Sequence, residues 1–534
     1  MKKNIIILLI LTFSILFCNK VSAASSNIYN IFTDNDGIRW EYKYENTSNA
    51  SNLYIAFYDK PSSITYVTVP SLNTIKLSNT TIPNSIKNII LTNYFPISGQ
   101  TPKSFLSNIN TIDLRNLQDI EGISPMINND IETTIIFSTN GAYIGDNVFA
   151  NTKLNLINLP LVKTIGEAAF KNATLNDPNL DLNNLLTIGD SAFYKTNIET
   201  VTINTASIAN NVFGECTNLT KVTLGDKVTT IGDGTFQQAT KLTTINFNNV
   251  KSLGNYAFKD CTSFNTNISN TKLENIGDGA FYNTPNYKLN ITIPPKVTTI
   301  NYATFYGSGI ISVNLNNVTK INSEAFSNCP RLSNIDFGHV VAIDYRAFYN
   351  DINLTKITLS DSVEHIMTQA FSNCSINSLN LNKIQRIDYE AFANNKLEKI
   401  YLPKTFNYMT ESNIFNNNNI TTVTVAYDTM SSTMPTNFRT LIGSNYQNIT
   451  TLYVIAPYGE NESAIIKSNY GAQRKTYTGY FNADAKENYG NANSYKNVIE
   501  PGYFYGLPSL TNVIISEGYE FIGSQAFYTE DPYT

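Results

Sequence analysis

The chain has 534 residues, of which 15% are charged, and a formal net charge of −5. Proteins that bind nucleic acid through electrostatics need clustered Lys and Arg to neutralise phosphates, so this composition excludes that class. The hydrophobic content of 42% is enough for a core and too high for an intrinsically disordered protein.

The first 23 residues have the pattern of a secretory signal peptide. Lys2 and Lys3 precede an apolar run over residues 5–17, and small residues end the segment at Val21 and Ala23. A charged start, an apolar run and a small-residue cleavage site predict export of the chain and cleavage after Ala23. The run is shorter than the roughly 20 residues that a membrane-spanning helix needs.

Residues 24–60 differ in sequence pattern from the rest of the chain. The segment GIRWEYKYEN at 37–46 alternates Trp40 with Tyr42 and Tyr44. We expect strands here that cap the first turn of a repeat array, because its open end would otherwise expose the core. A carbohydrate platform built on Trp40 is the alternative.

Residues 61–140 are interpreted as divergent repeats. Four strand-like segments follow one another at nearly even spacing, at residues 64–69, 86–91, 109–114 and 131–136. Each is rich in Ile, Val or Thr, as half-buried strands are. They lack the Ala-Phe element that marks the next region.

Residues 141–415 contain a regular repeat of about 22 residues. Its anchor is a phenylalanine that usually follows a small residue and has an aliphatic residue five positions earlier, as in TIGDGTF at 230–236. The repeat anchors are Phe149, Phe170, Phe193, Phe213, Phe236, Phe258, Phe281, Phe305, Phe326, Phe348, Phe371, Phe392 and Phe415, with a further anchor at Phe527.

Short segments between the anchors alternate apolar and polar residues. LTKVTL at 219–224 and LTKITL at 354–359 are examples, and this alternation predicts strands with one buried face. One such strand cannot bury its apolar face alone, whereas stacked units can. We therefore expect a leucine-rich-repeat solenoid, α/β by convention but mostly β, with a parallel sheet on one face and short helical turns on the other.

The consensus I-G-x-x-A-F-x-x-C-x-x-L-x-x-V-x-L resembles the repeat of the BspA-like leucine-rich-repeat family of bacterial surface proteins. The segments TTIGDGTFQQATKLTTINF and KINSEAFSNCPRLSNIDF are similar to it along their length. The resemblance covers residues 141–415 and 501–527. It implies secretion, surface display and adhesion to host or neighbouring-cell proteins, and it does not imply an enzyme.

Four cysteines remain after the signal peptide, and each follows an anchor by three residues: Cys216, Cys261, Cys329 and Cys374. Stacked strands lie about 4.8 Å apart, so cysteines two units apart are separated by about 10 Å. A disulfide requires Cα atoms within about 7 Å. We expect four free, buried thiols and no zinc site, because ligands in such a ladder do not converge.

The outward positions of the predicted strands indicate no catalytic centre. They are short, polar and nearly uncharged, as at Thr200, Thr202, Asn290 and Thr292. A glycosidase needs a close pair of carboxylates, which this face does not offer. We predict no catalytic, cofactor-binding or metal-binding residue, and no cofactor. The same Thr- and Asn-rich face is interpreted either as a recognition surface or as an ordinary solvated sheet.

Tyrosines are the candidate contacts with a partner. Tyr302, Tyr345 and Tyr389 share one repeat position, three residues before an anchor, and Tyr401 lies on the sheet face. Tyrosine supplies contact area at a low cost in side-chain entropy. The stripe therefore indicates an adhesive surface, with packing between the edges of the turns as the alternative.

Residues 416–500 interrupt the array, either as degenerate repeats or as an insertion. They contain Tyr477, Tyr480, Tyr489 and Tyr495. Insertions in repeat arrays lie on the surface and often carry function, so we expect these four tyrosines to contact a partner. A tolerated insertion without a role is the alternative.

Residues 501–534 resume the repeat but stop seven residues after Phe527, before the strand that would close the last unit. We therefore expect the chain to be a piece of a longer protein. A structural spacer that displays a further domain is accordingly the alternative to an adhesion protein.

The position three residues before the anchor holds Asp, Glu or Asn in seven successive units from Asp146 to Asp278. These are mostly N-cap residue types, so we expect Asp233 to cap a helical turn that carries Phe236, with Gly232 permitting the turn. A ladder of acids that share calcium ions is the alternative.

Together these patterns predict a secreted or cell-surface protein that mediates adhesion or another protein–protein interaction. The partner would be an extracellular-matrix or cell-surface protein. We expect no enzymatic activity, no nucleic-acid binding and no membrane span after the signal peptide is cleaved.

Overall fold

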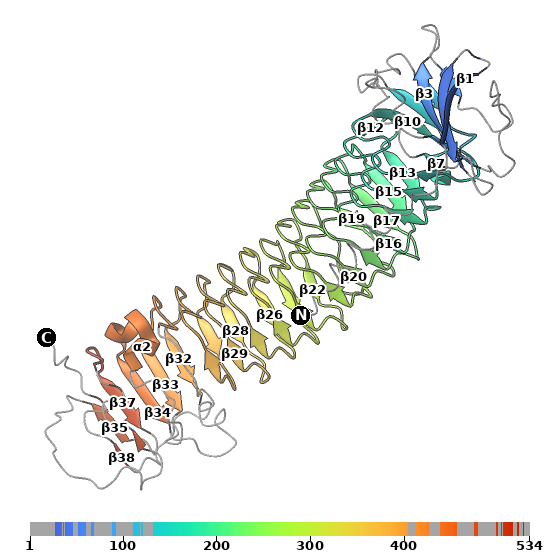
Figure 1. Cartoon of the computed structure of the whole chain (residues 1–534). Coiled ribbons are helices and arrows are strands. Elements are labelled where there is room, and N and C mark those ends of the chain that lie inside the picture. The colour runs from blue at the N-terminus through green and yellow to red at the C-terminus, as the bar shows by residue number, and fades with distance from the viewer. Residues whose placement is uncertain are drawn as a thin grey trace. The chain divides into compact units, whose positions relative to one another are not determined.

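The structure is a computed structural model (Figure 1). It describes residues 27–34, 36, 38–45, 52–59, 66–68, 88–91, 110–117, 119–120, 132–403, 413–426, 438–455, 475–478, 498–499, 504, 506–515, 521–522 and 527. The predicted signal peptide lies outside this part of the chain. The chain forms two compact units, Met1–Thr196 and Asn197–Thr534. The repeats build a parallel-strand β-solenoid with about 13 turns of about 22 residues and little helix.

The first unit starts with three strands in antiparallel order, β1 (Asn27–Thr33), β2 (Arg39–Glu45) and β3 (Asn52–Asp59). Trp40 in β2 is buried, and its indole N–H donates to Asp34 Oδ2 at 2.8 Å. A buried indole offers no platform for a carbohydrate, so that alternative is wrong. β3 runs parallel to the next strand of its sheet, so the antiparallel strands extend the edge of the repeat sheet.

Two parallel sheets follow in the first unit. One continues from β3 through β5 (Asn88–Leu91), β7 (Asp119–Ile120), β9 (Tyr143–Ile144), β11 (Thr164–Ile165) and β14 (Thr187–Ile188). The other contains β4 (Tyr66–Thr68), β6 (Thr111–Asp113), β8 (Thr133–Ile136), β10 (Lys153–Ile157) and β12 (Thr174–Leu175). The unit also holds the 3-10 helix η2 (Leu159–Leu161) and β13 (Asn179–Leu182).

The predicted strand at 86–91 contains β5, which pairs with β3 and β7, while the other three predicted strands of this region share the second sheet. The even spacing of the four segments is therefore not the register of a single sheet. Sequence spacing alone could not separate the two, because both sheets advance by one strand per turn.

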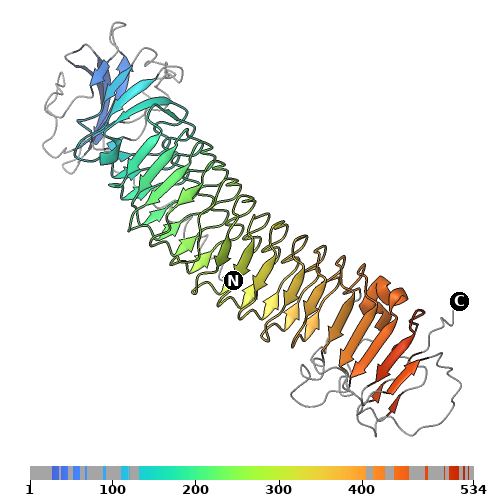
Figure 2. The same cartoon turned by 180° about the vertical axis from the view of Figure 1, so that it is seen from behind.

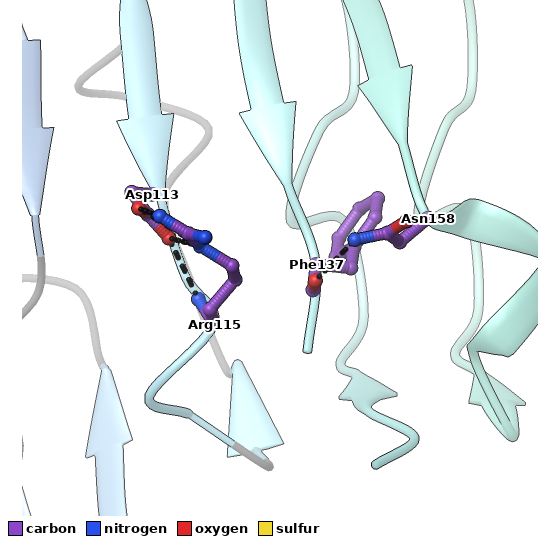
Figure 3. Close-up of polar contacts among 4 residues, drawn as sticks. All are labelled: Asp113, Arg115, Phe137 and Asn158. Carbon is purple, nitrogen blue, oxygen red and sulfur yellow. Dashed lines mark hydrogen bonds and ion pairs between the residues drawn. The ribbon is translucent and has the colours of Figure 1, made fainter. Parts of the chain in front are cut away.

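Polar side chains tie down the ends of strands in the second of these sheets (Figure 3). Asp113 is almost fully buried at the end of β6, and Arg115 Nη2 lies 2.6 Å from its Oδ2. A buried carboxylate without a partner would be costly, and the guanidinium compensates that charge. After β10, Asn158 Nδ2 donates to the Phe137 carbonyl at 3.2 Å, which joins two successive turns.

The second unit carries a row of strands on one face, one in most of its turns (Figure 2). In chain order these strands are β15 (Thr200–Ile203), β17 (Lys221–Leu224), β19 (Thr244–Ile245), β22 (Asn290–Thr292), β24 (Ser312–Asn314), β26 (Asn334–Asp336), β28 (Lys356–Thr358), β30 (Ser378–Asn380), β32 (Lys399–Leu402), β33 (Thr422–Ala426), β34 (Thr451–Ile455) and β37 (Asn512–Ile515). The predicted strands at 219–224 and 354–359 are β17 and β28, which confirms the parallel sheet.

A second row consists of two-residue strands, each of which ends at the aliphatic residue five positions before a phenylalanine of the repeat. The sequence pattern did not predict these strands. They are β16 (Ser207–Ile208), β18 (Thr230–Ile231), β20 (Ser252–Leu253), β21 (Asn275–Ile276), β23 (Thr299–Ile300), β25 (Lys320–Ile321), β27 (Ala342–Ile343), β29 (His365–Ile366), β31 (Arg386–Ile387), β36 (Val498–Ile499) and β38 (Phe521–Ile522). Both rows are parallel, so the paired strands of each row bond one turn to the next.

Near the C-terminus, two short helices connect successive strands of the sheet, and one strand pairs antiparallel to its neighbour. α2 (Phe438–Ile442) and the 3-10 helix η3 (Gly443–Asn448) lie between β33 and β34. β34 pairs directly with β37, so the chain between them adds no parallel strand to this sheet. It instead contributes β35 (Lys475–Thr478), which pairs antiparallel with β37 and occupies the edge of the sheet.

The anchor phenylalanines form the core of each of the two compact units. All are buried, and within each compact unit the rings of neighbouring turns stack with centroids 4.9 to 5.9 Å apart and planes within 20° of parallel. Phe504 and Phe527 form a further stacked pair at 5.4 Å. This spacing is close to the separation of neighbouring strands, so rings and strands advance together.

Backbone hydrogen bonds join the turns that carry the anchors to the next turn of the repeat. Phe236 N–H donates to the Ala257 carbonyl at 2.9 Å, and Phe258 N–H to the Ala280 carbonyl at 2.8 Å. Residues two before and two after each anchor from Phe149 to Phe415 have positive φ, as at Gly234 (57°) and Gln238 (59°). These left-handed residues interrupt any helix and turn alternate N–H groups toward the next unit.

Gly232 serves close approach between units. A Cβ at this position would lie 2.8 Å from the carbonyl carbon of Ala209 in the preceding turn. Gly254 stands at the same position one unit later, and its Cβ would lie 2.5 Å from the Asp233 backbone nitrogen. The expected role of Gly232 in permitting a turn is replaced by this packing role.

The Phe stack predicts a large effect of its removal. Phe348 lies between Phe326 and Phe371, at 5.2 and 5.0 Å. We expect Phe348→Ala to lower the free energy of unfolding by about 3–5 kcal/mol, through lost burial and a cavity. Chemical denaturation measures this change. Ile352→Ala, at an exposed position in the same turn, is the control and should change it by less than about 0.5 kcal/mol. Similar losses in both variants would contradict the stacked core.

Candidate functional site

The exposed sheet face is the first candidate surface. Asn290, Ser312 and Asn334 lie in register on β22, β24 and β26, and the side chain of Ser312 donates to Asn290 Oδ1 at 2.8 Å. This face is a ladder of small polar groups, as the sequence indicated. Over β22, β24 and β26 it lacks the tyrosine, tryptophan and arginine residues that are enriched in protein interfaces.

The acidic position before the anchor is a second candidate. Asp233 Oδ1 accepts a hydrogen bond at 2.7 Å from the backbone N–H of Asn255, the equivalent residue of the next unit. The same bond joins Asp146 to Glu167, Asn210 to Asp233, Asn255 to Asp278, and Asp278 to Tyr302. The expected N-cap is therefore wrong, because the side chain serves the following turn and not its own.

This bond explains the choice of Asp and Asn without a cation, since either side chain offers the accepting oxygen. Within the described part of the chain, no group of three or more His, Cys, Asp or Glu side chains is arranged to hold a metal. The calcium alternative thus has no structural support at this position.

The four thiols lie inside the stack, three residues after an anchor. Cys261, Cys329 and Cys374 are free thiols, and burial raises the pKa of each well above its ordinary value. A buried, protonated thiol is a poor nucleophile and a poor metal ligand. We therefore assign these cysteines to packing and hydrogen bonding inside the core.

The turns of the second unit carry a third candidate, which we call the tyrosine patch. It spans five successive turns, from the turn of Phe258 to that of Phe348. Its members are Tyr256, Lys259, Tyr282, Tyr302, Tyr306, Glu324, Tyr345, Arg346 and Tyr349. Three of these tyrosines are exposed, namely Tyr256, Tyr302 and Tyr345.

Cations and rings interlock at the first end of the patch. Lys259 Nζ lies 5.4 Å from the Tyr256 ring centroid and 5.5 Å from that of Tyr282. The Tyr282 ring stacks on Tyr306 with centroids 4.7 Å apart. Such cation–π and stacking contacts hold the rings in place before any partner arrives.

The other end of the patch is built around Arg346. Its guanidinium lies 4.9 Å from the Tyr345 ring centroid and 4.8 Å from that of Tyr349. Arg346 Nε also donates to Gln369 Oε1 at 2.7 Å, and Gln369 in turn donates to Glu390. The arginine is thus fixed between two rings and an amide.

Glu324 connects the middle of the patch. The Tyr302 hydroxyl donates to Glu324 Oε2 at 3.3 Å, and this carboxylate raises the pKa of Tyr302. Partial burial, more than any neighbouring charge, raises the pKa of Tyr282. Both phenols therefore stay protonated at neutral pH and act as hydrogen-bond donors.

Three members of the patch adopt left-handed backbone. Tyr256 has φ of 55°, Glu324 of 57° and Arg346 of 52°, at one repeat position, which Gly234 and Gly279 occupy in the two turns adjacent to Tyr256. A Cβ on Gly279 would lie 2.4 Å from Tyr256 Cε1, so the ring covers this glycine. Bulky side chains in this region cost backbone energy that glycine avoids.

The tyrosines expected from the sequence fall in different places. Tyr302 and Tyr345 belong to the patch, whereas Tyr389 and Tyr401 are only half exposed. Tyr477 lies in β35, at the sheet edge, opposite Val513. Tyr480, Tyr489 and Tyr495 lie outside the described residues.

Four tyrosines of the patch were missed, and most of them carry a sequence signal. Tyr282, Tyr306 and Tyr349 each follow an anchor by one residue, so they share a column as Tyr302 and Tyr345 do. Tyr256 stands two residues before its anchor, where other units have small or polar residues.

The chain matches the family described as BspA type leucine rich repeat region in six copies. The matched residues are 142–265, 186–310, 251–342, 319–440 and 487–532. No curated protein sequence matches the chain significantly. Within the described residues, no helix combines the length and apolarity required to cross a bilayer.

Several solved structures are similar in fold. A leucine-rich repeat protein from Bacteroides ovatus is 20% identical, with 76% of this chain and 94% of that chain covered and a TM-score of 0.49. A leucine-rich repeat protein from Eubacterium ventriosum is 20% identical over 78% and 99%, with a TM-score of 0.36. The pneumococcal vaccine antigen PcpA is 14% identical over 83% and 97%, with a TM-score of 0.30.

The Asp ladder yields a test that separates hydrogen bonding from metal binding. Asp233→Asn keeps an oxygen for the Asn255 N–H and should leave stability nearly unchanged. Asp233→Ala removes the acceptor and should lower the free energy of unfolding by about 0.5–1.5 kcal/mol. Denaturation with and without a chelator measures both. A loss in Asp233→Asn equal to that in Asp233→Ala, together with a fall in melting temperature on chelation, would restore the calcium alternative.

Proposed function

The chain belongs to the BspA-type leucine-rich repeat family, and from that premise we propose that it is a secreted or cell-surface protein that adheres to a protein partner. The family is a repeat scaffold, and its fold is typical of protein–protein interaction and generally non-enzymatic. The signal-peptide pattern at residues 1–23 supports secretion. Extracellular-matrix and cell-surface proteins are the proposed partners.

The tyrosine patch is the proposed contact surface, and its composition carries the proposal. Tyrosine and arginine are enriched at the energetic centres of protein interfaces. Here six tyrosines, one arginine and one lysine occupy adjacent turns, whereas the sheet face offers mostly Thr, Asn and Ser. The rings are also held by their neighbours, so binding would cost little side-chain entropy.

The geometry of the rings favours a protein partner over a glycan. A sugar stacks on an open aromatic face. In this patch, faces of Tyr282 are occupied by Tyr306 and Lys259, and Arg346 lies over the rings of Tyr345 and Tyr349. Several ring faces are therefore already occupied by neighbouring side chains, whereas the mixed tyrosine, arginine and lysine groups suit the mixed polar and apolar surface of a protein.

The residue type at Tyr256 adds a second argument for a binding role. The left-handed backbone there recurs in every turn from Asn147 to Asn413 and belongs to the scaffold, but the other turns carry small or polar residues at this position. A structural spacer, which displays a further domain and binds nothing, is the alternative. It gives no reason for a large, exposed aromatic side chain at this position.

Tyr256→Gly separates binding from stability. Glycine suits the left-handed backbone, so this variant should be as stable as the native chain or more stable. We expect it, combined with Tyr302→Ala and Tyr345→Ala, to weaken binding at least tenfold, about 1.4 kcal/mol. Surface plasmon resonance of the whole protein against purified extracellular-matrix proteins measures the affinity.

Thr358→Ala on the sheet face is the matched control and should leave the affinity unchanged. If the native protein binds none of the matrix proteins and no cell-surface protein, adhesion is refuted and the spacer remains. If the sheet-face variant loses binding while the patch variant retains it, the contact surface is the sheet.

A further inference from the structure

One column of the solenoid joins several turns to the preceding anchor. Three residues after an anchor, or after Ile442 in the case of Asn445, a side chain inside the stack donates to the carbonyl of the anchor one turn earlier. These bonds run from Cys261 to Phe236, Cys329 to Phe305, Cys374 to Phe348, Asn395 to Phe371, Asn418 to Phe392 and Asn445 to Phe415, at 2.6–3.1 Å. In these turns the column supplies a buried donor to the preceding anchor carbonyl. Elsewhere Thr152, Thr196 and Thr284 donate to their own anchor carbonyl, and the buried Ala173 and Ala239 supply no donor.

Asp351 occupies this column and is fully buried. Its Oδ1 accepts from the backbone N–H of Cys329 at 2.7 Å. Its Oδ2 is also buried and has no hydrogen-bond partner among the described residues. At the same repeat position, the side-chain amides of Asn395 and Asn418 satisfy both neighbours. Their Oδ1 accepts from a backbone N–H, and their Nδ2 donates to backbone carbonyls. An ionised carboxylate has no such second end.

We propose that Asp351 is held as a neutral acid whose Oδ2 proton is donated to the carbonyl of Phe326. Low pH then strengthens the contact between the turn of Phe326 and the turn of Asp351, which we call the joint. With the proton in place, Asp351 continues the column as an asparagine would. Without it, a buried negative charge would face carbonyl oxygens. The turn must then open and admit water.

The surroundings agree with a neutral acid. Burial raises the pKa of Asp351 well above its ordinary value, and the bond from Cys329 N–H offsets only part of this. The titratable groups that face Asp351 from the neighbouring turns are the thiols of Cys329 and Cys374, both buried and with raised pKa. No cation among the described residues shifts Asp351 toward its charged form.

The direction of the pH dependence follows from these facts. The folded acid binds its proton more tightly than the exposed acid, so the stabilising effect is complete below a pH of about 4, the pKa of an exposed carboxyl. Above that value, opening releases one proton, and the opening constant rises about tenfold per pH unit until the folded pKa is reached. The joint therefore opens more often as the pH rises, up to the pKa of the folded acid.

The joint lies in a turn that carries the tyrosine patch. Asp351 follows Phe348 by three residues, in the same turn as Tyr345, Arg346 and Tyr349. Opening at Asp351 would release this end of the patch, so adhesion would weaken as pH rises. This consequence rests on the proposed function, whereas the neutral acid and its joint do not.

Amide hydrogen exchange on the whole protein, without any partner, tests the joint. The probes are the N–H groups of Cys329, Phe348 and Asn350, and protection is corrected for the intrinsic exchange rate at each pH. In the native chain we expect protection to fall about tenfold per pH unit above pH 5, up to the pKa of the folded acid. In Asp351→Asn, which restores the donor of the neighbouring units, protection should not depend on pH.

Asn395→Asp is the reciprocal variant, since it places an acid at the same position of a later turn. Protection of Asn394 and Leu397 should then acquire the tenfold slope, while Phe236 N–H, in a distant turn, should be unaffected in every variant. Infrared spectra of the native chain at pH 7 should contain a buried protonated-carboxyl band that Asp351→Asn lacks.

Two results would overturn the inference. One is protection in the native chain that does not change with pH, together with no protonated-carboxyl band, which would mean that Asp351 is ionised in the folded state. The other is an equal slope in the native chain and in Asp351→Asn, which would assign the pH dependence to another group. Neither outcome bears on whether the patch binds a partner, which the affinity measurements decide separately.

Discussion

The structure depends on one distance, the separation of about 5 Å between equivalent residues of successive turns. Strands pair at this distance, and the anchor rings stack at 4.9 to 5.9 Å within each unit. The backbone N–H of each anchor also reaches the next turn, as from Phe236 to Ala257. Gly232 and Gly254 allow that approach because a Cβ would collide with the preceding turn. Each repeat position thereby becomes a column of side chains in contact.

In such a column, the residue type at a position depends on the hydrogen bond that its side chain makes to the neighbouring turn. In an ordinary turn, Asp233 would serve its own backbone; here it serves the equivalent residue of the next turn. Inside the stack, the Cys, Asn and Asp residues of one column share the task of donating to the preceding anchor carbonyl, and Asp351 can share it only as an acid. Residues with unlike chemistry are therefore equivalent in such an array when they supply the same hydrogen bond to the neighbouring turn.

The same reasoning explains what the sequence could predict. The period, the buried phenylalanines and the parallel sheet follow from apolar spacing, because burial is repeated in every unit. The N-cap expected at Asp233 was wrong because its hydrogen-bond partner lies 22 residues away, and a local pattern does not show which turn a side chain serves. The segment at 86–91 was ambiguous because both sheets advance once per turn. Tyr256 was missed because it does not recur.

The location of the tyrosine patch on the turns, and not on the sheet, has a physical reason. A strand offers outward positions that alternate and are already bonded to their neighbours, as from Ser312 to Asn290. The turns have left-handed residues on either side of each anchor, which direct side chains such as Tyr256 and Arg346 along the stack and over the adjacent turn. Rings and cations from successive units can therefore interlock there, as Lys259 does between Tyr256 and Tyr282. A surface on the turns can therefore be both wide and rigid. Its rigidity depends on the packing of every turn that carries it, including the turn in which Asp351 lies.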